Sequence, residues 1–134
     1  MPGERPFLDT NILVYAILAD DPKAPAAKAL RNAGGVISVQ VLNELTNVLR
    51  RKLAQPWDKV HRVLAITRQI LEIVPLTEIT HETGLRLAER YSLSIYDAMI
   101  VAAAFESGCE VLWSEDMQNG LLIEGRLRIR NPFL

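Results

Sequence analysis

Short apolar runs punctuate this chain and are followed by polar or turn-forming residues. Such runs occur at Pro6–Leu8, Val36–Ser38 and Glu110–Trp113, and they predict short buried strands. Residues 73–76 form a further short extended segment that is broken by a proline, and "LLIEGRLRI" (residues 121–129) predicts a last strand or strand pair.

Between these runs, apolar residues recur every three or four positions, which is the spacing of a helix with one buried face. The clearest stripe follows Ser38, a suitable N-cap, and the helix should end before Pro56. A helix that begins at Ser94 is apolar nearly all round, which predicts burial, and Gly108 supplies its stop. The other expected helices cover Thr10–Leu18, Lys23–Ala33, Trp57–Glu72 and a stretch capped by Thr80 that ends near Tyr91.

Strands that alternate with helices predict an α/β fold built in layers around a central, mostly parallel sheet of short strands, flanked by helices. The 134 residues contain no repeat and no Gly/Ser-rich linker, so we expect a single domain over residues 1–134. In open parallel sheets of this kind, ligands bind beyond the carboxyl ends of the strands.

The amino-acid composition narrows the possible classes of protein. Hydrophobic residues at 49% and charged residues at 23% indicate a globular protein, and a net charge of −1 means that nucleic-acid binding would need a local basic patch. The single cysteine, Cys109, cannot form an internal disulfide, which fits a reducing cytosol. The start "MPGERPF" lacks a long apolar segment, and the longest apolar run, Ala98–Phe105, is too short for a bilayer. We therefore expect a cytoplasmic protein that neither is secreted nor enters a membrane.

Four carboxylates stand at unusual positions. Asp9 and Asp116 each lie at or just after the end of a predicted strand, Glu44 lies on the flank of a buried stripe, and Asp97 falls in the first turn of the most apolar helix. Taken singly, these acids favour structure: Asp9 can cap a helix, Asp97 is placed for a capping box with Ser94, and Asp116 suits a turn.

Taken together, the four acids predict a shared anionic pocket. Like charges that are crowded in this way repel one another, and a hard divalent cation with oxygen ligands removes the conflict. His61, His81 and Cys109 lie far apart in the sequence, so Mg²⁺ or Mn²⁺ is favoured over zinc. Mg²⁺ is commonly shared with substrate phosphates, and metal-assisted hydrolysis of a phosphodiester is the natural chemistry.

The chain resembles the PIN-domain ribonucleases, in particular the VapC-like toxins of prokaryotic toxin–antitoxin pairs. The resemblance covers nearly the whole chain and lies in the order and spacing of "FLDTNILVY", "SVQVLNEL", "SIYDAMIVAAAFESGCEVLWSEDMQNG" and "IRNPF". It implies a PIN-like three-layer sandwich. It also implies an acidic site formed, residue by residue, by Asp9, Glu44, Asp97 and Asp116.

In the family, Asn11 and the hydroxyl of Ser114 assist the acids by hydrogen bonding, with serine here in place of the commoner threonine. The resemblance implies in-line attack on RNA phosphorus by a water that one or two Mg²⁺ or Mn²⁺ ions activate. Asp9, Asp97 and Glu44 are then metal ligands, directly or through water, and Asp116 is a ligand or orients the water. It further implies a cognate antitoxin that inhibits the enzyme, and a homodimer.

RNA must also be held by basic residues. Leu49–Lys52 offers a basic cluster, and Arg126, Arg128 and Arg130 share one face of the last predicted strand, although a solvated charged face explains each set as well. Glu115, the neighbour of Asp116, should point the other way in an extended segment and be solvated.

Two rival functions remain at this point. A haloacid-dehalogenase-type phosphatase also begins with an acid after strand one, but it needs a second acid two residues later, where this chain has Asn11. A PIN-like module that binds RNA or protein without cutting is the other alternative. Such a binder has no reason to keep four acids that repel one another.

Overall fold

The computed structural model describes residues 5–134, and the N-terminal residues used above against a secretion signal lie in part outside the described residues. Its sheet has the order β3-β2-β1-β4-β6-β5, in which neighbouring strands run parallel except for the antiparallel pair β5 and β6. The strands are β1 (Pro6–Leu8), β2 (Val36–Ser38), β3 (Glu72–Val74), β4 (Val111–Trp113), β5 (Leu122–Ile123) and β6 (Leu127–Arg130).

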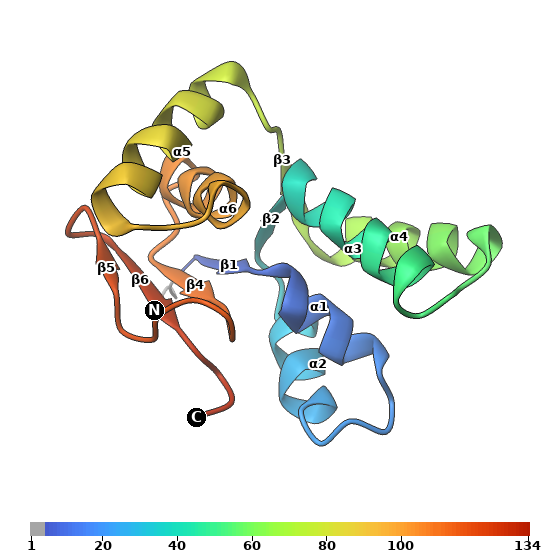
Figure 1. Ribbon diagram of the computed structural model, residues 1–134. Helices are drawn as coiled ribbons and strands as arrows, with labels where there is room; N and C mark the ends of the chain where they lie inside the picture. Colours follow the sequence, from blue (N-terminus) through green and yellow to red (C-terminus); the bar gives the residue numbers. More distant parts are fainter. Residues whose placement is uncertain (1–4) are drawn as a thin grey trace.

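Helices cover both faces of this sheet, which confirms the predicted α/β class with a mostly parallel central sheet. In Figure 1, α5 and α6 lie on one side of the strands, and α1 to α4 lie on the other, with α3 and α4 extending outward as a pair. The helices are α1 (Thr10–Ile17), α2 (Ala24–Asn32), α3 (Val39–Arg51), α4 (Trp57–Ile70), α5 (Glu78–Tyr91) and α6 (Ile95–Glu106).

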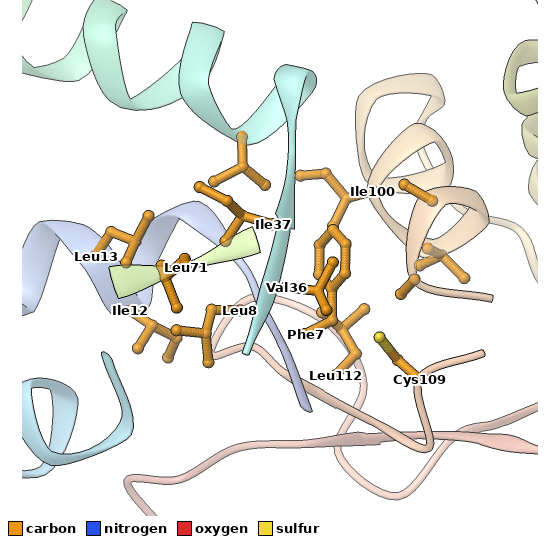
Figure 2. Close-up of a cluster of buried hydrophobic side chains, with 14 of the residues drawn as sticks. Phe7, Leu8, Ile12, Leu13, Val36, Ile37, Leu71, Ile100, Cys109 and Leu112 are labelled. Atoms are coloured by element: carbon orange, nitrogen blue, oxygen red, sulfur yellow. The ribbon is translucent and has the colours of Figure 1, made fainter. Parts of the chain in front are cut away.

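The two central strands supply side chains to both faces, as the alternation along a strand requires. Figure 2 shows Phe7 and Val36 turned toward α6, whereas Leu8 and Ile37 turn toward α1 on the opposite side. All four side chains are fully or almost fully buried. Strands buried on both faces read as continuous apolar runs, which is why these short segments were visible in the sequence.

Two helix boundaries differ from the sequence prediction by more than one residue. Thr77, and not Thr80, is the N-cap of α5: its hydroxyl accepts from the Thr80 backbone N–H at 3.1 Å, and the Thr80 hydroxyl accepts from the Thr77 N–H at 3.3 Å. This reciprocal capping box satisfies two donors, where Thr80 alone would satisfy one. The helix that begins at Trp57 ends at Ile70, because Glu72 enters β3 and its N–H bonds to the Gly35 carbonyl at 2.9 Å.

Gly35 lies where the chain enters β2 and closely approaches the neighbouring strand. Its φ is +143°, and a Cβ atom there would stand 2.8 Å from the backbone oxygen of Pro6. A side chain cannot be accommodated without a shift of the backbone, so glycine is required for β2 to sit beside β1.

Cys109 is fully buried next to the core, and burial raises the pKa of its thiol to about 11. It therefore serves as a small apolar side chain, as the sequence suggested. Within residues 5–134, no helix is long and apolar enough to cross a membrane.

Candidate active site

Asp9 directly follows β1 and begins α1. Its Oδ1 accepts from the Thr10 backbone N–H at 2.7 Å, and its Oδ2 accepts from the Ser114 hydroxyl at 2.7 Å and the Asn11 amide at 3.4 Å. Only 4% of Asp9 is exposed, and burial is the main reason that its pKa is raised to about 7. Asp9 thus caps α1, as one of the two sequence interpretations predicted. It is also a buried acid whose charged form is disfavoured.

Parallel pairing of β1 with β4 brings Ser114 to Asp9. Leu8 is in register with Trp113, and the Asp9 N–H donates to the Trp113 carbonyl at 2.9 Å, so the next residue on each strand lies side by side. Ser114 is fully buried, and its oxygen also accepts from the Met117 backbone N–H at 3.3 Å. The hydroxyl is therefore held with its proton directed at Asp9.

Asn11 links the first acid to the last. Its amide nitrogen donates to Asp116 Oδ2 at 3.0 Å as well as to Asp9, and its amide oxygen accepts from the Glu115 backbone N–H at 3.3 Å. These contacts fix the loop after β4 against the first turn of α1. The resemblance gave Asn11 an assisting role by hydrogen bonding, and the geometry is compatible with that role.

Glu44 lies half-buried on α3, and both of its carboxylate oxygens are engaged. Oε1 accepts from the Thr10 hydroxyl at 2.8 Å, and Oε2 accepts from the Gln40 amide at 3.0 Å. Neither Thr10 nor Gln40 was singled out from the sequence. Thr10 belongs to the "DTN" motif, so its position beside two acids was an available signal, whereas the Gln40 contact depends on its place one helical turn before Glu44.

Asp97 lies half-buried in the first turn of α6, and its N–H donates to the Ser94 hydroxyl at 3.2 Å, which is the Ser94 half of the predicted capping box. Its pKa is raised, first by burial and then by the negative charges of Glu44 and Asp116. The charges of Asp97 and Glu44 likewise raise the pKa of Asp9. Asp97 is therefore within electrostatic reach of the other three acids, and Asp9 is within reach of Asp97 and Glu44, although the four residues come from separate parts of the chain.

A pocket of about 550 Å³ opens beside these acids between α1, α3 and the loop after β4. Its polar floor is formed by Thr10, Asn11, Glu44 and Asp116. In residues 5–134, no three His, Cys, Asp or Glu side chains are placed to hold a metal ion between them. The donor set nonetheless fits a hard cation in kind, because the ligands on offer are carboxylate oxygens whose mutual repulsion a divalent ion would relieve.

Glu115 contradicts its predicted solvated state. Its side chain accepts from the Tyr15 hydroxyl at 2.6 Å, forms an ion pair with Lys23 and is only 21% exposed, and Glu115 lines the same pocket as Asp116. These bonds lower the pKa of Glu115. The sequence carried no signal for this cluster, since it joins residues that are far apart in the chain.

The two predicted basic clusters differ in their relation to Glu44. Arg126 and Arg128 donate to the backbone carbonyls of Phe105 and Gly120, whereas Arg130 of the same predicted cluster is exposed. In the other cluster, Arg50 donates to the Gln55 carbonyl and Arg51 is exposed at the end of α3. The cluster on α3 is the one that shares a helix with Glu44.

Fold and site together define a three-layer α/β domain with an acidic centre beyond the carboxyl ends of its parallel strands. The model of the PIN domain family matches residues 7–118, and the chain belongs to this family. A search of curated proteins found no match.

Several solved structures have the same fold. A toxin–antitoxin complex from Klebsiella pneumoniae superposes with a TM-score of 0.71 at 21% identity, over 94% of this chain and 96% of that one. VapC20 of Mycobacterium tuberculosis, described as a toxin that cleaves the sarcin–ricin loop, gives 0.68 at 21% identity, over 83% and 91%. VapBC2 of Rickettsia felis, bound to a promoter DNA fragment, gives 0.69 at 22% identity, over 94% and 97%.

Proposed function

We propose that this protein is a metal-dependent endoribonuclease and the toxin of a toxin–antitoxin pair. The observation that carries the proposal is the gathering of Asp9, Glu44, Asp97 and Asp116 around the end of β1 in a PIN domain, with each pKa shift at Asp9 and Asp97 partly caused by the other acids. The toxins among the similar structures support the same class of activity.

The acids hold Mg²⁺ or Mn²⁺, with Asp9, Glu44 and Asp97 as ligands and Asp116 as a ligand or water-orienting group. When bound, the metal supplies a polarised water and positive charge beside the scissile phosphate. Asn11 keeps Asp116 turned toward Asp9, and Ser114 donates to Asp9 so that its carboxylate stays charged at a lower pH. Thr10 and Gln40 hold the Glu44 side chain in place.

The proposed setting is the cytoplasm, where the enzyme forms a homodimer and a cognate antitoxin inhibits it. Two of the similar structures are toxin–antitoxin complexes by their descriptions, which supports such a partner. Co-purification with the product of the neighbouring reading frame tests the antitoxin, and analytical ultracentrifugation of the purified chain tests the dimer.

The decisive experiment is cleavage of a broad panel of RNAs by the purified, partner-free protein. Mg²⁺ or Mn²⁺ should support cleavage, EDTA should abolish it, and Asp9→Ala or Asp97→Ala should remove it without unfolding the protein. Circular dichroism of each variant is the control. A wild-type protein that cuts none of these RNAs with either ion, while still binding them, would favour the non-catalytic module.

A further inference from the structure

A second pocket, of about 490 Å³, is lined by residues of α3 and by the first residue of α4, and the proposed reaction does not use it. The lining is polar and basic with one aromatic ring and contains no acid: Asn43, Thr46, Asn47, Arg50, Arg51 and Trp57. A basic pocket on a protein with a net charge of −1 is a local feature that selects for anionic ligands.

Trp57 is a largely exposed aromatic residue whose ring lies beside His61, with 6.1 Å between the ring centroids. It is the first residue of α4, it is 54% exposed, and the guanidinium of Arg50 stands 4.4 Å from the ring centroid. Arg50 is itself held by a 2.8 Å bond to the Gln55 carbonyl, so the ring and the guanidinium form a fixed stack at the mouth of the pocket. Aromatic rings presented beside arginines are the usual platform for unpaired bases.

The second pocket neighbours the first along α3. Asn47 lines both pockets, and Glu44, Asn47 and Arg51 follow one another at helical spacing along one side of α3. From Glu44 to Arg51 the helix rises by about 10 Å, so a strand of a few nucleotides can reach from one pocket to the other. An RNA held at the acids therefore meets Trp57 with its flanking nucleotides.

We propose that the pocket around Trp57 is a subsite for single-stranded RNA beside the cleaved phosphodiester. An unpaired base stacks on the exposed indole, and Arg50 and Arg51 neutralise the adjoining phosphates. Asn43 and Asn47 offer amide groups to the sugar and base. The subsite requires an unpaired segment, because a base within a duplex has no free face to stack. This inference rests on the proposed nuclease function.

The test measures RNA binding in EDTA, where cleavage does not occur, by fluorescence anisotropy of a labelled single-stranded RNA of mixed sequence. Trp57→Ala should weaken binding about 5- to 100-fold, whereas Trp57→Phe should keep most of the affinity because it retains a stacking ring. Arg51→Ala should weaken binding and make it less sensitive to salt. Arg68→Ala, an exposed arginine of α4 outside the pocket, is the matched control and should change little.

A second readout follows the indole directly. In a Trp113→Phe background, Trp57 is the remaining tryptophan, and RNA should quench its emission with the same midpoint as the anisotropy. Unchanged RNA binding by a folded Trp57→Ala protein would overturn the subsite. A Trp57→Ala protein that no longer binds the antitoxin but keeps its affinity for RNA would overturn it as well. If the nuclease proposal alone is wrong, binding still depends on Trp57 but no RNA is cut when Mg²⁺ or Mn²⁺ is added.

Discussion

Asp9 combines two roles that usually belong to different residues. Its Oδ1 caps α1, while its Oδ2 receives the Ser114 hydroxyl in a site where burial and neighbouring acids disfavour its charge. The cap fixes the carboxylate in one orientation, and the burial gives it a strong preference for either a proton or a cation. The sequence favoured a helix cap and an acid of the site equally for Asp9. In the structure, Asp9 is placed for both roles.

Replacement of Asp9 by Asn should stabilise the metal-free protein at neutral pH. The folded-state pKa of about 7 lies above the ordinary value of about 3.9, so the contribution of Asp9 to folding is complete below about pH 4 and is lost as the pH rises toward 7. Asn keeps the cap without the charge, and the melting temperature in EDTA should rise by several degrees at pH 8.

The difference between the Asp9→Asn variant and the wild type should shrink as the pH is lowered to 4. Thermal denaturation between pH 4 and pH 8 measures this trend. A variant less stable than the wild type at pH 8 would show that capping by the carboxylate outweighs its burial.

Ser114 should set the pH dependence of cleavage through Asp9. The hydroxyl bond lowers the pKa of Asp9, so Ser114→Ala should raise that pKa, move the acidic limb of the rate profile to higher pH and reduce activity at neutral pH about tenfold. Ser114→Thr retains the donor and serves as the control. If the acidic limb of the pH–rate profile shifts in Ser114→Thr as well, or shifts in neither variant, the Ser114 hydroxyl does not set the pKa of Asp9.

At the scale of elements, apolar runs and caps made most of the architecture predictable. Strands β1 and β2 were expected at their observed bounds, because residues buried on both faces leave an unbroken apolar signal. Ser38 and Ser94 were recognised as caps for the same local reason. The end of α4 was not predicted correctly, because the pairing of β3 with β2 is a contact between distant segments that outweighs helical periodicity.

Asp9, Asp97 and Asp116 could be singled out because strand ends and helix starts are readable in the sequence, and Glu44 because it lies on the flank of a buried helical stripe. Their joint role in a metal site stays a prediction. The hydrogen-bond partners of the acidic residues were harder to predict from the sequence. The bond from Gln40 to Glu44 joins residues one helical turn apart, so its spacing was readable in the sequence although the pair was not singled out. The contact of Glu115 with Tyr15 and Lys23 joins distant segments and has no local pattern in the sequence, so only the structure identifies it.

Gly35 and Gly34 offer a matched pair for the entry into β2. Both have positive φ, but a Cβ at Gly35 meets the Pro6 carbonyl, whereas one at Gly34 meets nothing within 4 Å. Gly35→Ala should therefore lower the free energy of unfolding by about 1–3 kcal/mol more than Gly34→Ala does. Urea denaturation of the two variants measures the difference, and equal losses would mean that backbone strain alone accounts for both.

At the scale of the whole molecule, the acidic site has basic residues beside it. Asp9 and Asp116 lie beyond the ends of β1 and β4, and Arg50 and Arg51 lie in the last turn of α3, the helix that carries Glu44, while the net charge is only −1. An RNA strand is therefore attracted by one region and repelled by its neighbour until the acids are neutralised. Cation binding and RNA binding should each favour the other through this arrangement.

Mg²⁺ or Mn²⁺ should stabilise the folded wild-type protein, because the folded chain gathers carboxylates that the unfolded chain disperses. The melting temperature should rise with ion concentration, and Asp9→Asn should lose most of the rise. The same ion series with K⁺ at matched ionic strength controls for screening. A rise of equal size in the variant would place the bound ion away from Asp9.

The strand order has a consequence for synthesis of the chain. β1 pairs with β4, and β4 pairs with β6, so Asp9 acquires Ser114 and Asp116 only after more than a hundred further residues have been added. A nascent chain on the ribosome therefore has no assembled acidic centre until the last strands have emerged. A prematurely terminated fragment would carry the opening motif without Ser114 and Asp116, and under the proposed function it would be an inactive nuclease.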